Sequence, residues 1–325
     1  MEKEPKKLED LSILVSTYNE KDNISFLVYL IHYYLKPLNI NYEIVVVDDN
    51  SPDGTASVVE KLQELFTNDF LAKYDFPHIP MFNKHGTDGS EKEFEKLNTA
   101  LVSMDSLLSP DNPKNSSRSS KSSDAKEKRK PRDRKSPKKD EVMAKVVDRS
   151  IKLVKREKKL GLGSSYVFGL SHCKYDFVLI LDADLSHHPM YIPSMLRLQK
   201  EKDLDVVVCS RYRSEGGASG WPLQRIFISK SLNYVCKTLF NPEVTDLTGS
   251  FRLYRKDVLS KVITTIHSKG FLFQVEMILK CEKLLNAKVD EIPIVFIERI
   301  YGKSKLGFTE ILKGLLGLLK LTWEF

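Results

Sequence analysis

The amino-acid sequence predicts an α/β fold in which helices cover both faces of a mostly parallel central sheet. Short apolar runs alternate with segments of helical periodicity over residues 11–66 and again over residues 151–181. This alternation is the order that parallel βαβ units require. Two of the runs, VVV and FVLIL, are apolar without a break, which is typical of strands buried on both faces.

The individual elements follow in chain order. We expect strands at Leu11–Val15, Glu43–Val47, Ile151–Val154 and Phe177–Leu181, with helices near Asn23–Leu35, Thr55–Phe66 and Gly163–Cys173 between them. Beyond these we expect a helix from Pro189, a strand at Asp205–Cys209, helices at Pro222–Phe240, Lys256–Ile266 and Phe273–Leu285, and a strand near Val289–Phe296. The proline at the start of the helix from residue 189 suits a first helical turn.

Residues 74–145 interrupt this rhythm. From residue 111 to 140 the sequence is rich in Ser, Lys, Arg and Pro, and it cannot bury enough apolar surface to offset its ordering entropy. We therefore predict a largely disordered insertion in a domain formed by residues 1–73 and 146–307. Residues 114–139 carry twelve basic and three acidic side chains, a local charge of +9, so the other 299 residues sum to −2. Because the basicity belongs to one tract, no nucleic-acid partner is expected, although a non-enzymatic basic binding protein stays an alternative.

The ends of the chain bear on its location. The N-terminus has no apolar segment of the signal-peptide type, which predicts a cytosolic chain, and four widely spaced cysteines fit buried thiols. The sequence contains no run of 18 apolar residues, so it predicts no spanning helix.

Residues 308–325 predict an amphipathic helix, and residues 222–240 carry a similar apolar stripe. Since we expect no core left to cover the terminal helix, it would meet a membrane surface or a partner helix. Its apolar face comprises Leu312, Leu315, Leu316, Leu319 and Trp323.

An acidic pair marks the candidate chemistry. Asp182 and Asp184 follow the buried run FVLIL, at the carboxyl edge where open α/β sheets bind ligands. Residues two apart in extended chain point to the same side, and two such carboxylates repel unless a cation lies between them. Mg²⁺ or Mn²⁺ meets this need through oxygen ligands. The spelling DADLS also occurs in haloacid-dehalogenase-type phosphatases, but that alternative lacks its later acidic motif and leaves the loop at Asp48 unused.

Polar residues follow two more strands at the same edge. Asp48 and Asp49 end the run EIVVV and enter a turn in which Asp53 or Thr55 would cap the next helix. Asp48, the first residue past the apolar run, is well placed to hydrogen-bond a base or a ribose. The segment STYNE follows the first strand. Three consecutive strand ends therefore predict one crevice.

The motifs VSTYNE, VVVDDNSPDGT, REKKLGLGSSY, DADLSHHP, SRY, DLTGSFRLYRK and IYGKSKLG together resemble the dolichol-phosphate mannosyltransferases, in the inverting family 2 of GT-A-fold glycosyltransferases. The resemblance covers nearly all the chain except about residues 74–145. It implies a GT-A fold and transfer of mannose from GDP-mannose to dolichyl phosphate, for GPI-anchor and N-glycan assembly. It also implies peripheral association with the cytoplasmic face of the endoplasmic reticulum membrane, with small transmembrane subunits as partners. Because residues 308–325 contain no run of 18 apolar residues, we do not expect the C-terminal anchor that some relatives carry.

The resemblance also implies roles for particular residues. Around the guanosine it places Tyr18, Glu20, Val46 and Asp48. At the diphosphate and the metal it places Asp182, Ala183 and Asp184, with Ser186 at a third metal-ligand position where some relatives have Gln. For the phosphate groups it implies Arg211, Arg299 and Lys305, to which we add Arg225 on its amphipathic helix; Asp182, Asp184, Arg211 and Lys305 are the expected catalytic set. Ser16 stands where relatives often have Pro.

The chemistry of a lipid phosphate acceptor agrees with such a site. A phosphate monoester with a second pKa of about 6 is largely ionised near neutral pH, so it can attack the sugar without a strong general base. The reaction instead needs cations, for which Arg offers bidentate geometry and Lys a mobile point charge. An enzyme that moves glucose from UDP-glucose to dolichyl phosphate would have the same fold and is the nearest alternative.

Overall fold

The structure, a computed structural model, describes residue 8 and residues 10–65, 147–268, 272–299, 317–318 and 321–324 of the 325-residue chain. All of them belong to one compact unit that comprises residues 1–73 and 147–325. The predicted insertion at 74–145 lies outside the described residues, so its disorder stays a prediction. The four cysteines are free thiols, and all four are buried.

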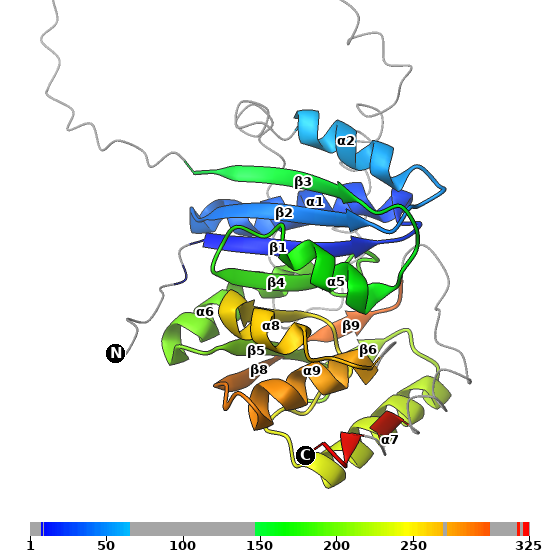
Figure 1. Cartoon of the computed structure of the whole chain (residues 1–325), viewed down its shortest axis with the longest axis vertical. Coiled ribbons are helices and arrows are strands. Elements are labelled where there is room, and N and C mark those ends of the chain that lie inside the picture. Colours follow the sequence, from blue (N-terminus) through cyan, green and yellow to red (C-terminus); the bar gives the residue numbers. More distant parts are fainter. Residues whose placement is uncertain are drawn as a thin grey trace, which may run out of the picture. The chain divides into compact units, whose positions relative to one another are not determined.

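A seven-stranded sheet with the order β3-β2-β1-β4-β7-β5-β8 forms the centre of this unit (Figure 1). Its strands are β1 (Asp10–Thr17), β2 (Asn41–Asp48), β3 (Arg149–Lys155), β4 (Phe177–Asp182), β5 (Val206–Ser210), β7 (Arg252–Arg255) and β8 (Val289–Pro293). The pairings are parallel except at β7, which runs antiparallel to both β4 and β5. The prediction of a mostly parallel α/β sheet is thus confirmed, whereas β7 was not expected.

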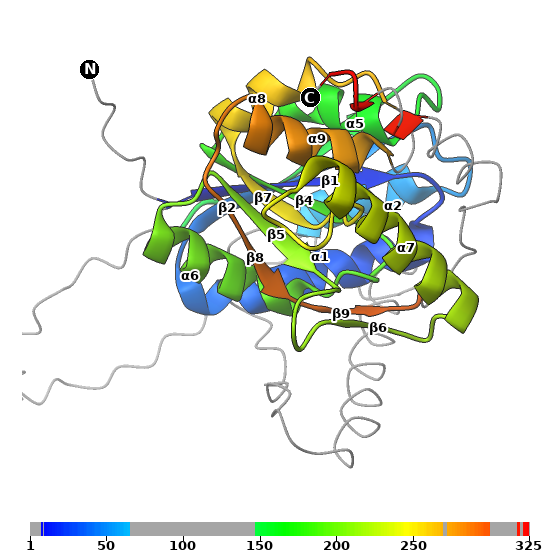
Figure 2. The same cartoon turned by 90° about the horizontal axis from the view of Figure 1, so that it is seen from below.

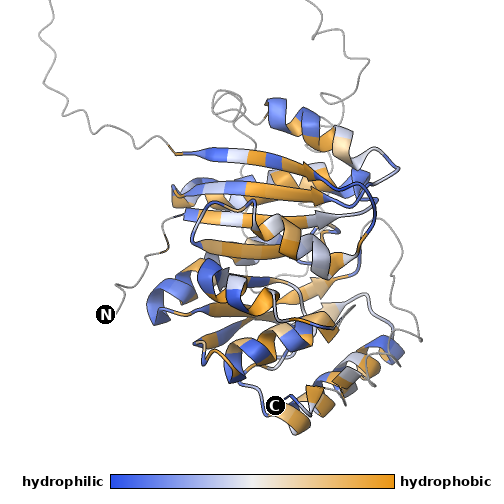
Figure 3. Cartoon of the chain, in the orientation of Figure 1, coloured by the Kyte–Doolittle hydropathy of each residue, from blue (hydrophilic) through white to orange (hydrophobic). Residues whose placement is uncertain are grey.

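Helices cover both faces of the sheet (Figure 2). The helices are α1 (Lys21–Leu35), α2 (Thr55–Leu65), α5 (Leu162–Leu170), α6 (Ile192–Lys202), α7 (Leu223–Phe240), α8 (Lys256–Ile263) and α9 (Leu272–Lys283), with 3₁₀ turns η1 (Lys36–Leu38) and η3 (Pro189–Tyr191). α1 and α6 lie on one face, and α5, α8 and α9 lie on the other. The central strands are strongly hydrophobic along their length (Figure 3). This is the arrangement that the unbroken apolar runs predicted.

The register of the central strands places their carboxyl ends at one level. Thr17 at the end of β1 is paired with Asp48 of β2, and Ser16 is paired with Asp182 of β4. A slip of one residue would move every side chain to the opposite face of the sheet and disrupt its packing against the helices there. The polar residues that follow the strands therefore meet at one edge of the sheet.

The predicted strand near Val289–Phe296 is divided in two. β8 ends at Pro293, and β9 (Val295–Ile297) pairs in parallel with β6 (Gly217–Ser219) in a separate two-stranded sheet. The change of partner occurs at Ile294, whose N–H donates to the carbonyl of Ser210 while its own carbonyl accepts from Gly217. Proline, which has no N–H to give to a ladder, is suited to such a boundary.

The described part of the C-terminal segment packs into the domain. Leu318 and Leu321 are buried in the main hydrophobic core, and the ammonium of Lys280 on α9 lies 3.0 Å from the carboxylate of Glu324. The expectation that no core remains for this segment is wrong for these residues, because they join the core cluster to which α9 contributes, and the neighbouring Gly317 lies against Leu272. The helix predicted for residues 308–325 lies mostly outside the described residues. Among the described helices none is long and apolar enough to cross a membrane.

Gly169 gives a test of how closely α5 packs on the sheet. A Cβ atom added there would lie 2.3 Å from Cδ1 of Leu14 and 2.7 Å from Cγ2 of Val47. We expect Gly169→Ala to lower the free energy of unfolding by about 1–3 kcal/mol, since overpacking forces strained side chains. Urea unfolding measures this. Gly217→Ala is the control, because its added Cβ would meet no atom within 4 Å. Equal midpoints for the two variants would contradict this packing.

Candidate active site

The two aspartates at the end of β4 are held by hydrogen bonds, Asp182 from two other parts of the fold and Asp184 from its own turn. Asp182 Oδ1 accepts a hydrogen bond from Tyr166 on α5 at 3.2 Å, and Oδ2 accepts one from Ser250 at 2.6 Å. Asp184 is buried, and its Oδ1 accepts the hydroxyl of Ser186 at 2.5 Å and the N–H of the same residue at 3.1 Å. The orientation of both carboxylates is therefore fixed before any ligand binds.

Arg299 supplies a positive charge to this pair. Its Nε lies 2.8 Å from Oδ2 of Asp184. This arginine arrives from the segment that follows β9, 115 residues further along the chain. In this structure the guanidinium of Arg299 thus occupies one carboxylate oxygen of the candidate metal site.

The donor atoms suit a hard divalent cation. Asp182, Asp184 and the Ser186 hydroxyl offer oxygen ligands, the preference of Mg²⁺ and Mn²⁺. No cluster of three His, Cys, Asp or Glu residues in the described ranges could hold an ion by itself, so ligand phosphates or water would complete its coordination. His187 Nδ1 is buried without a hydrogen-bond partner and lies 3.6 Å from Asp182 Oδ2. Burial lowers the pKa of His187 although Asp182 and Asp184 act in the opposite direction.

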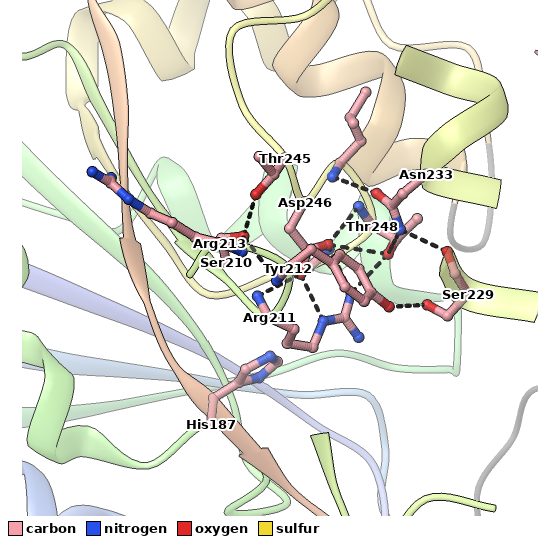
Figure 4. A network of polar contacts seen from close by, with 12 residues as sticks. His187, Ser210, Arg211, Tyr212, Arg213, Ser229, Asn233, Thr245, Asp246 and Thr248 are labelled. Atoms are coloured by element: carbon pink, nitrogen blue, oxygen red, sulfur yellow. Dashed lines mark hydrogen bonds and ion pairs between the residues drawn. The ribbon is translucent and has the colours of Figure 1, made fainter. Parts of the chain in front are cut away.

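Arg211 is fixed by a buried carboxylate (Figure 4). Its Nε lies 2.7 Å from Asp246 Oδ2, its Nη2 lies 2.8 Å from Asp246 Oδ1, and its backbone N–H donates to the same carboxylate at 3.1 Å. Burial alone would raise the pKa of Asp246, but the charge and hydrogen bonds of Arg211 outweigh it and lower the pKa to about 2. Thr248 accepts a further hydrogen bond from Nη2 at 2.7 Å. Nη1 is the guanidinium nitrogen that neither Asp246 nor Thr248 uses.

Arg225 on α7 has a carboxylate partner as well. Its Nη1 lies 2.8 Å and 3.1 Å from the two carboxylate oxygens of Glu298. Its guanidinium lies 4.0 Å from the ring centroid of Trp221, and that of Arg211 lies 5.3 Å from the same centroid. The three described arginines that we expected to bind phosphate are therefore all paired with carboxylates. Lys305, the fourth expected cation, lies outside the described residues.

Hydrogen bonds join the ends of β1 and β2, where we expected a crevice. Asp48 is buried and accepts hydrogen bonds from Thr17 Oγ1 at 3.0 Å and from Ser51 Oγ at 2.6 Å. The expectation that Asp53 caps the following helix is confirmed, since its Oδ1 accepts the N–H of Thr55 at 2.9 Å.

The remaining expected nucleotide-site residues differ in accessibility. Val46 is fully buried within β2, so its side chain is not accessible to a ligand in this structure. Ala183 is buried between the two aspartates of the acidic pair. The carboxylate of Glu20 accepts a hydrogen bond from Asn23 at 2.8 Å. Tyr18 is partly exposed, and the ammonium of Lys159 lies 3.7 Å from its ring centroid.

Several residues at this edge were not predicted to take part. They are Tyr166, Asp246, Ser250, Trp221, Glu298 and Lys159. Asp246 and Ser250 belong to the motif DLTGSFRLYRK, which the sequence had marked as part of the site. The contact of Ser250 with Asp182 of β4 could not be predicted, because it depends on the unexpected strand β7. Glu298 precedes Arg299 directly and carried no sequence signal of its own.

Sheet order and site together define a GT-A fold, the fold of nucleotide-diphospho-sugar transferases, with an acidic pair at the end of β4. Residues 12–77 and 133–263 match the family described as Glycosyl transferase family 2. The chain belongs to this family and is a glycosyltransferase.

Three relatives are similar over long stretches. Undecaprenyl-phosphate mannosyltransferase of Micrococcus luteus is 34% identical over 163 residues, covering 49% of this chain and 66% of the relative. Polyprenol monophosphomannose synthase of Mycolicibacterium smegmatis is 24% identical over 304 residues, 92% of this chain and 82% of the relative. Dolichol-phosphate mannosyltransferase of Pyrococcus furiosus is 28% identical over 321 residues, 97% and 64%. The chain spans slightly less than two thirds of the length of the first and the third.

Among solved structures, glucosyl-3-phosphoglycerate synthase from Mycobacterium tuberculosis is similar with a TM-score of 0.53 and 12% identity, over 97% of this chain and 79% of the other. That structure contains Mn²⁺, UDP and phosphoglyceric acid. At this identity the likeness shows the fold alone.

The Arg299–Asp184 pair predicts how the site responds to metal. Because Arg299 engages an oxygen that a divalent cation would need, Arg299→Gln should tighten Mn²⁺ binding to the ligand-free protein by about 2–5-fold, the equivalent of a partly exposed ion pair. Titration followed by electron paramagnetic resonance measures free Mn²⁺. Arg225→Gln, which removes a cation paired with Glu298 instead, is the matched control and should leave the affinity unchanged. Unchanged or weaker binding in Arg299→Gln would show that the ion pair does not compete with the metal.

Proposed function

We propose that the protein transfers mannose from GDP-mannose to dolichyl phosphate and releases dolichyl β-D-mannosyl phosphate and GDP. The observation that carries the proposal is the gathering of an acidic pair and three arginines at one sheet edge, in a chain whose relatives are named as polyprenyl- or dolichyl-phosphate mannosyltransferases. The product would serve as mannose donor for GPI-anchor and N-glycan assembly.

The proposed mechanism assigns a task to each group. Bound Mg²⁺ or Mn²⁺ supplies charge stabilisation at the diphosphate leaving group. Asp182 and Asp184, oriented by Tyr166, Ser250 and Ser186, offer it oxygen ligands. Metal-containing GT-A neighbours support this use of a divalent ion in general.

The arginines would act on the two phosphate-bearing substrates. Asp246 fixes Arg211 with its Nη1 available to a phosphate oxygen, while Arg225 and Arg299 would exchange their carboxylates for phosphate. The acceptor phosphate is ionised near neutral pH and needs no general base. His187, the buried imidazole beside Asp182, has a lowered pKa and would stay neutral. Attack opposite the leaving group inverts the anomeric carbon.

The rival interpretations of the sequence are now reduced to one. Membership of a glycosyltransferase family excludes the haloacid-dehalogenase-type phosphatase and the non-enzymatic binding protein. The glucosyltransferase that would use UDP-glucose has the same fold, so a donor assay must separate the two.

Purified protein with a polyprenyl phosphate acceptor and Mn²⁺ should form glycolipid from GDP-mannose and not from UDP-glucose. The mannosyl linkage should be β by NMR, because one displacement inverts an α-linked donor. Asp184→Asn should lower turnover by about 10²–10³-fold, as expected for loss of one preorganised electrostatic group. Asp257→Asn, at an exposed acid on α8, is the matched control. An α-linked product, turnover of UDP-glucose, or near-normal Asp184→Asn activity would each contradict the proposal.

A lipid acceptor requires a membrane-facing surface, for which α7 offers the best candidate. Leu223, Phe227 and Tyr234 are 83%, 73% and 74% exposed and recur at helical spacing. Lys230 lies on the same face between Phe227 and Tyr234, and Lys237 lies at its edge, where both suit anionic headgroups. Figure 3 shows the apolar residues along α7. We propose peripheral association with the cytoplasmic face of the endoplasmic reticulum, aided by small transmembrane subunits.

The double variant Leu223→Ser/Phe227→Ser should reduce co-sedimentation with vesicles of mixed neutral and anionic phospholipids by at least several-fold. Each replacement removes an exposed apolar side chain that the bilayer interface would bury. Transfer to a short, water-soluble prenyl phosphate should persist. Leu38→Ser, at an exposed leucine in η1, is the control and should sediment like the wild type. Full vesicle binding by the double variant would show that α7 does not face the membrane.

A further inference from the structure

The loop between β3 and α5 is fixed to the end of β2 by one buried carboxylate. Asp49 accepts hydrogen bonds from the guanidinium of Arg156, from the N–H of Leu160 at 3.2 Å and from the N–H of Gly161 at 3.1 Å. Arg156 also donates its backbone N–H to the carbonyl of Asp48 at 2.9 Å and its Nη2 to Ser164 at 2.6 Å. The position of residues 156–161 is therefore set at both ends.

Gly161 makes this anchoring possible. Its φ of +91° lies in the region that favours glycine, and α5 begins at the next residue. The loop thus turns sharply between its attachment to Asp49 and the helix. The side chain of the residue just before Leu160 is directed along the sheet edge towards β1.

That residue is Lys159. Its ammonium lies 3.7 Å from the centre of the Tyr18 ring, which follows the end of β1. The neighbouring Asn19 donates its N–H to Ser51 at 3.0 Å, and Ser51 donates to Asp48. Lys159 thus contacts the aromatic ring of Tyr18, and the residue after Tyr18 is linked through Ser51 to the carboxylate of Asp48, so three separate segments are connected.

These three groups complement one type of planar ligand. The carboxylate of Asp48 accepts three hydrogen bonds from Thr17 and Ser51, and since a carboxylate has about four acceptor sites, one remains for a donor on a base. Lys159 offers only donors, which fit the O6 and N7 acceptors of guanine and oppose the amino group of adenine or cytosine. A cation–π contact at an exposed site is worth only about 0.5–1 kcal/mol, so an arriving base can readily exchange for it.

We propose that Lys159 is a specificity-determining residue that selects a donor nucleotide whose base bears a carbonyl oxygen at the edge where adenine and cytosine bear an amino group. The inference rests on the proposed function in placing the donor base at Tyr18, and it identifies guanine as the base. Asp49 positions Lys159 through the N–H groups of the next two residues and takes no part in contacting the ligand.

Calorimetric titration of the full-length protein with Mn²⁺ and nucleoside diphosphates tests this. GDP is compared with ADP and with 2-aminopurine riboside diphosphate, which lacks O6. Lys159→Met should weaken GDP binding by about 5–20-fold, within the range of one good base contact, and the other two by less than about 2-fold. Lys158→Met is the matched control, a neighbouring exposed lysine, and should bind all three like the wild type.

The variant Lys159→Glu distinguishes a specific effect on base selection from a general loss of folding. It replaces a donor by an acceptor, so ADP should gain affinity relative to GDP, which a damaged fold would not produce. Equal losses for all nucleotides in Lys159→Met would assign Lys159 to the phosphates, and unchanged GDP binding would remove it from the site. Either result overturns the proposed role of Lys159 in selecting the base and does not affect the proposal of mannosyl transfer.

Titrations with UDP and CDP separate failure of this inference from failure of the proposed donor, GDP-mannose. If the wild type binds UDP and not GDP, GDP-mannose is wrong, but a loss of UDP and not CDP binding in Lys159→Met would still support selection of the carbonyl-bearing base. If the wild type binds no nucleotide, both proposals are overturned.

Discussion

The arrangement of the site depends on the register of three parallel strands. Thr17, Asp48 and Lys155 are joined in one row across β1, β2 and β3, and Ser16 pairs with Asp182 on the other side of β1. Packing of both faces against helices fixes this register, since a slip by one residue would move each side chain to the opposite face. The residues that leave each strand therefore emerge at the same edge, which is a precondition for every contact described between them.

The antiparallel strand β7 adds a second group of residues to that edge. Because β7 enters the sheet between β4 and β5 from the ligand side, its preceding turn brings Ser250 to Asp182 and Asp246 to Arg211. Arg252 is fully buried at the start of β7 and donates to the carbonyls of Leu247 at 2.7 Å and Gln274 at 2.8 Å. One buried guanidinium thus ties this turn to α9.

The sequence allowed prediction of the elements whose signals are local. Strands β1, β2 and β4 followed from apolar runs, and the cap formed by Asp53, one of the two capping residues expected, followed from the turn sequence before the helix. β7 was missed because its sequence RLYR has charged ends that suggest exposure, although Arg252 is buried by carbonyl partners. The partners of the arginines are separated from them by 35 to 115 residues, so no spacing rule could have paired them.

The three carboxylate pairs differ in how readily they can open. Asp246 is completely buried and receives several donors, so removing Arg211 from it would strand a charge in the interior. The side chains of Arg225 and Glu298 are 25% and 37% exposed, so water can compensate both groups when they separate. Arg299 is 23% exposed, but its partner Asp184 is only 6% exposed, so opening that pair needs another cation to replace the arginine at Asp184. Glu298 and Arg299 are adjacent, and the N–H of Ile297 just before them donates to the carbonyl of Ser186. A ligand that separates Arg225 from Glu298, or Arg299 from Asp184, therefore acts on the same short segment. This segment lies near Arg211, which Asp246 holds in place.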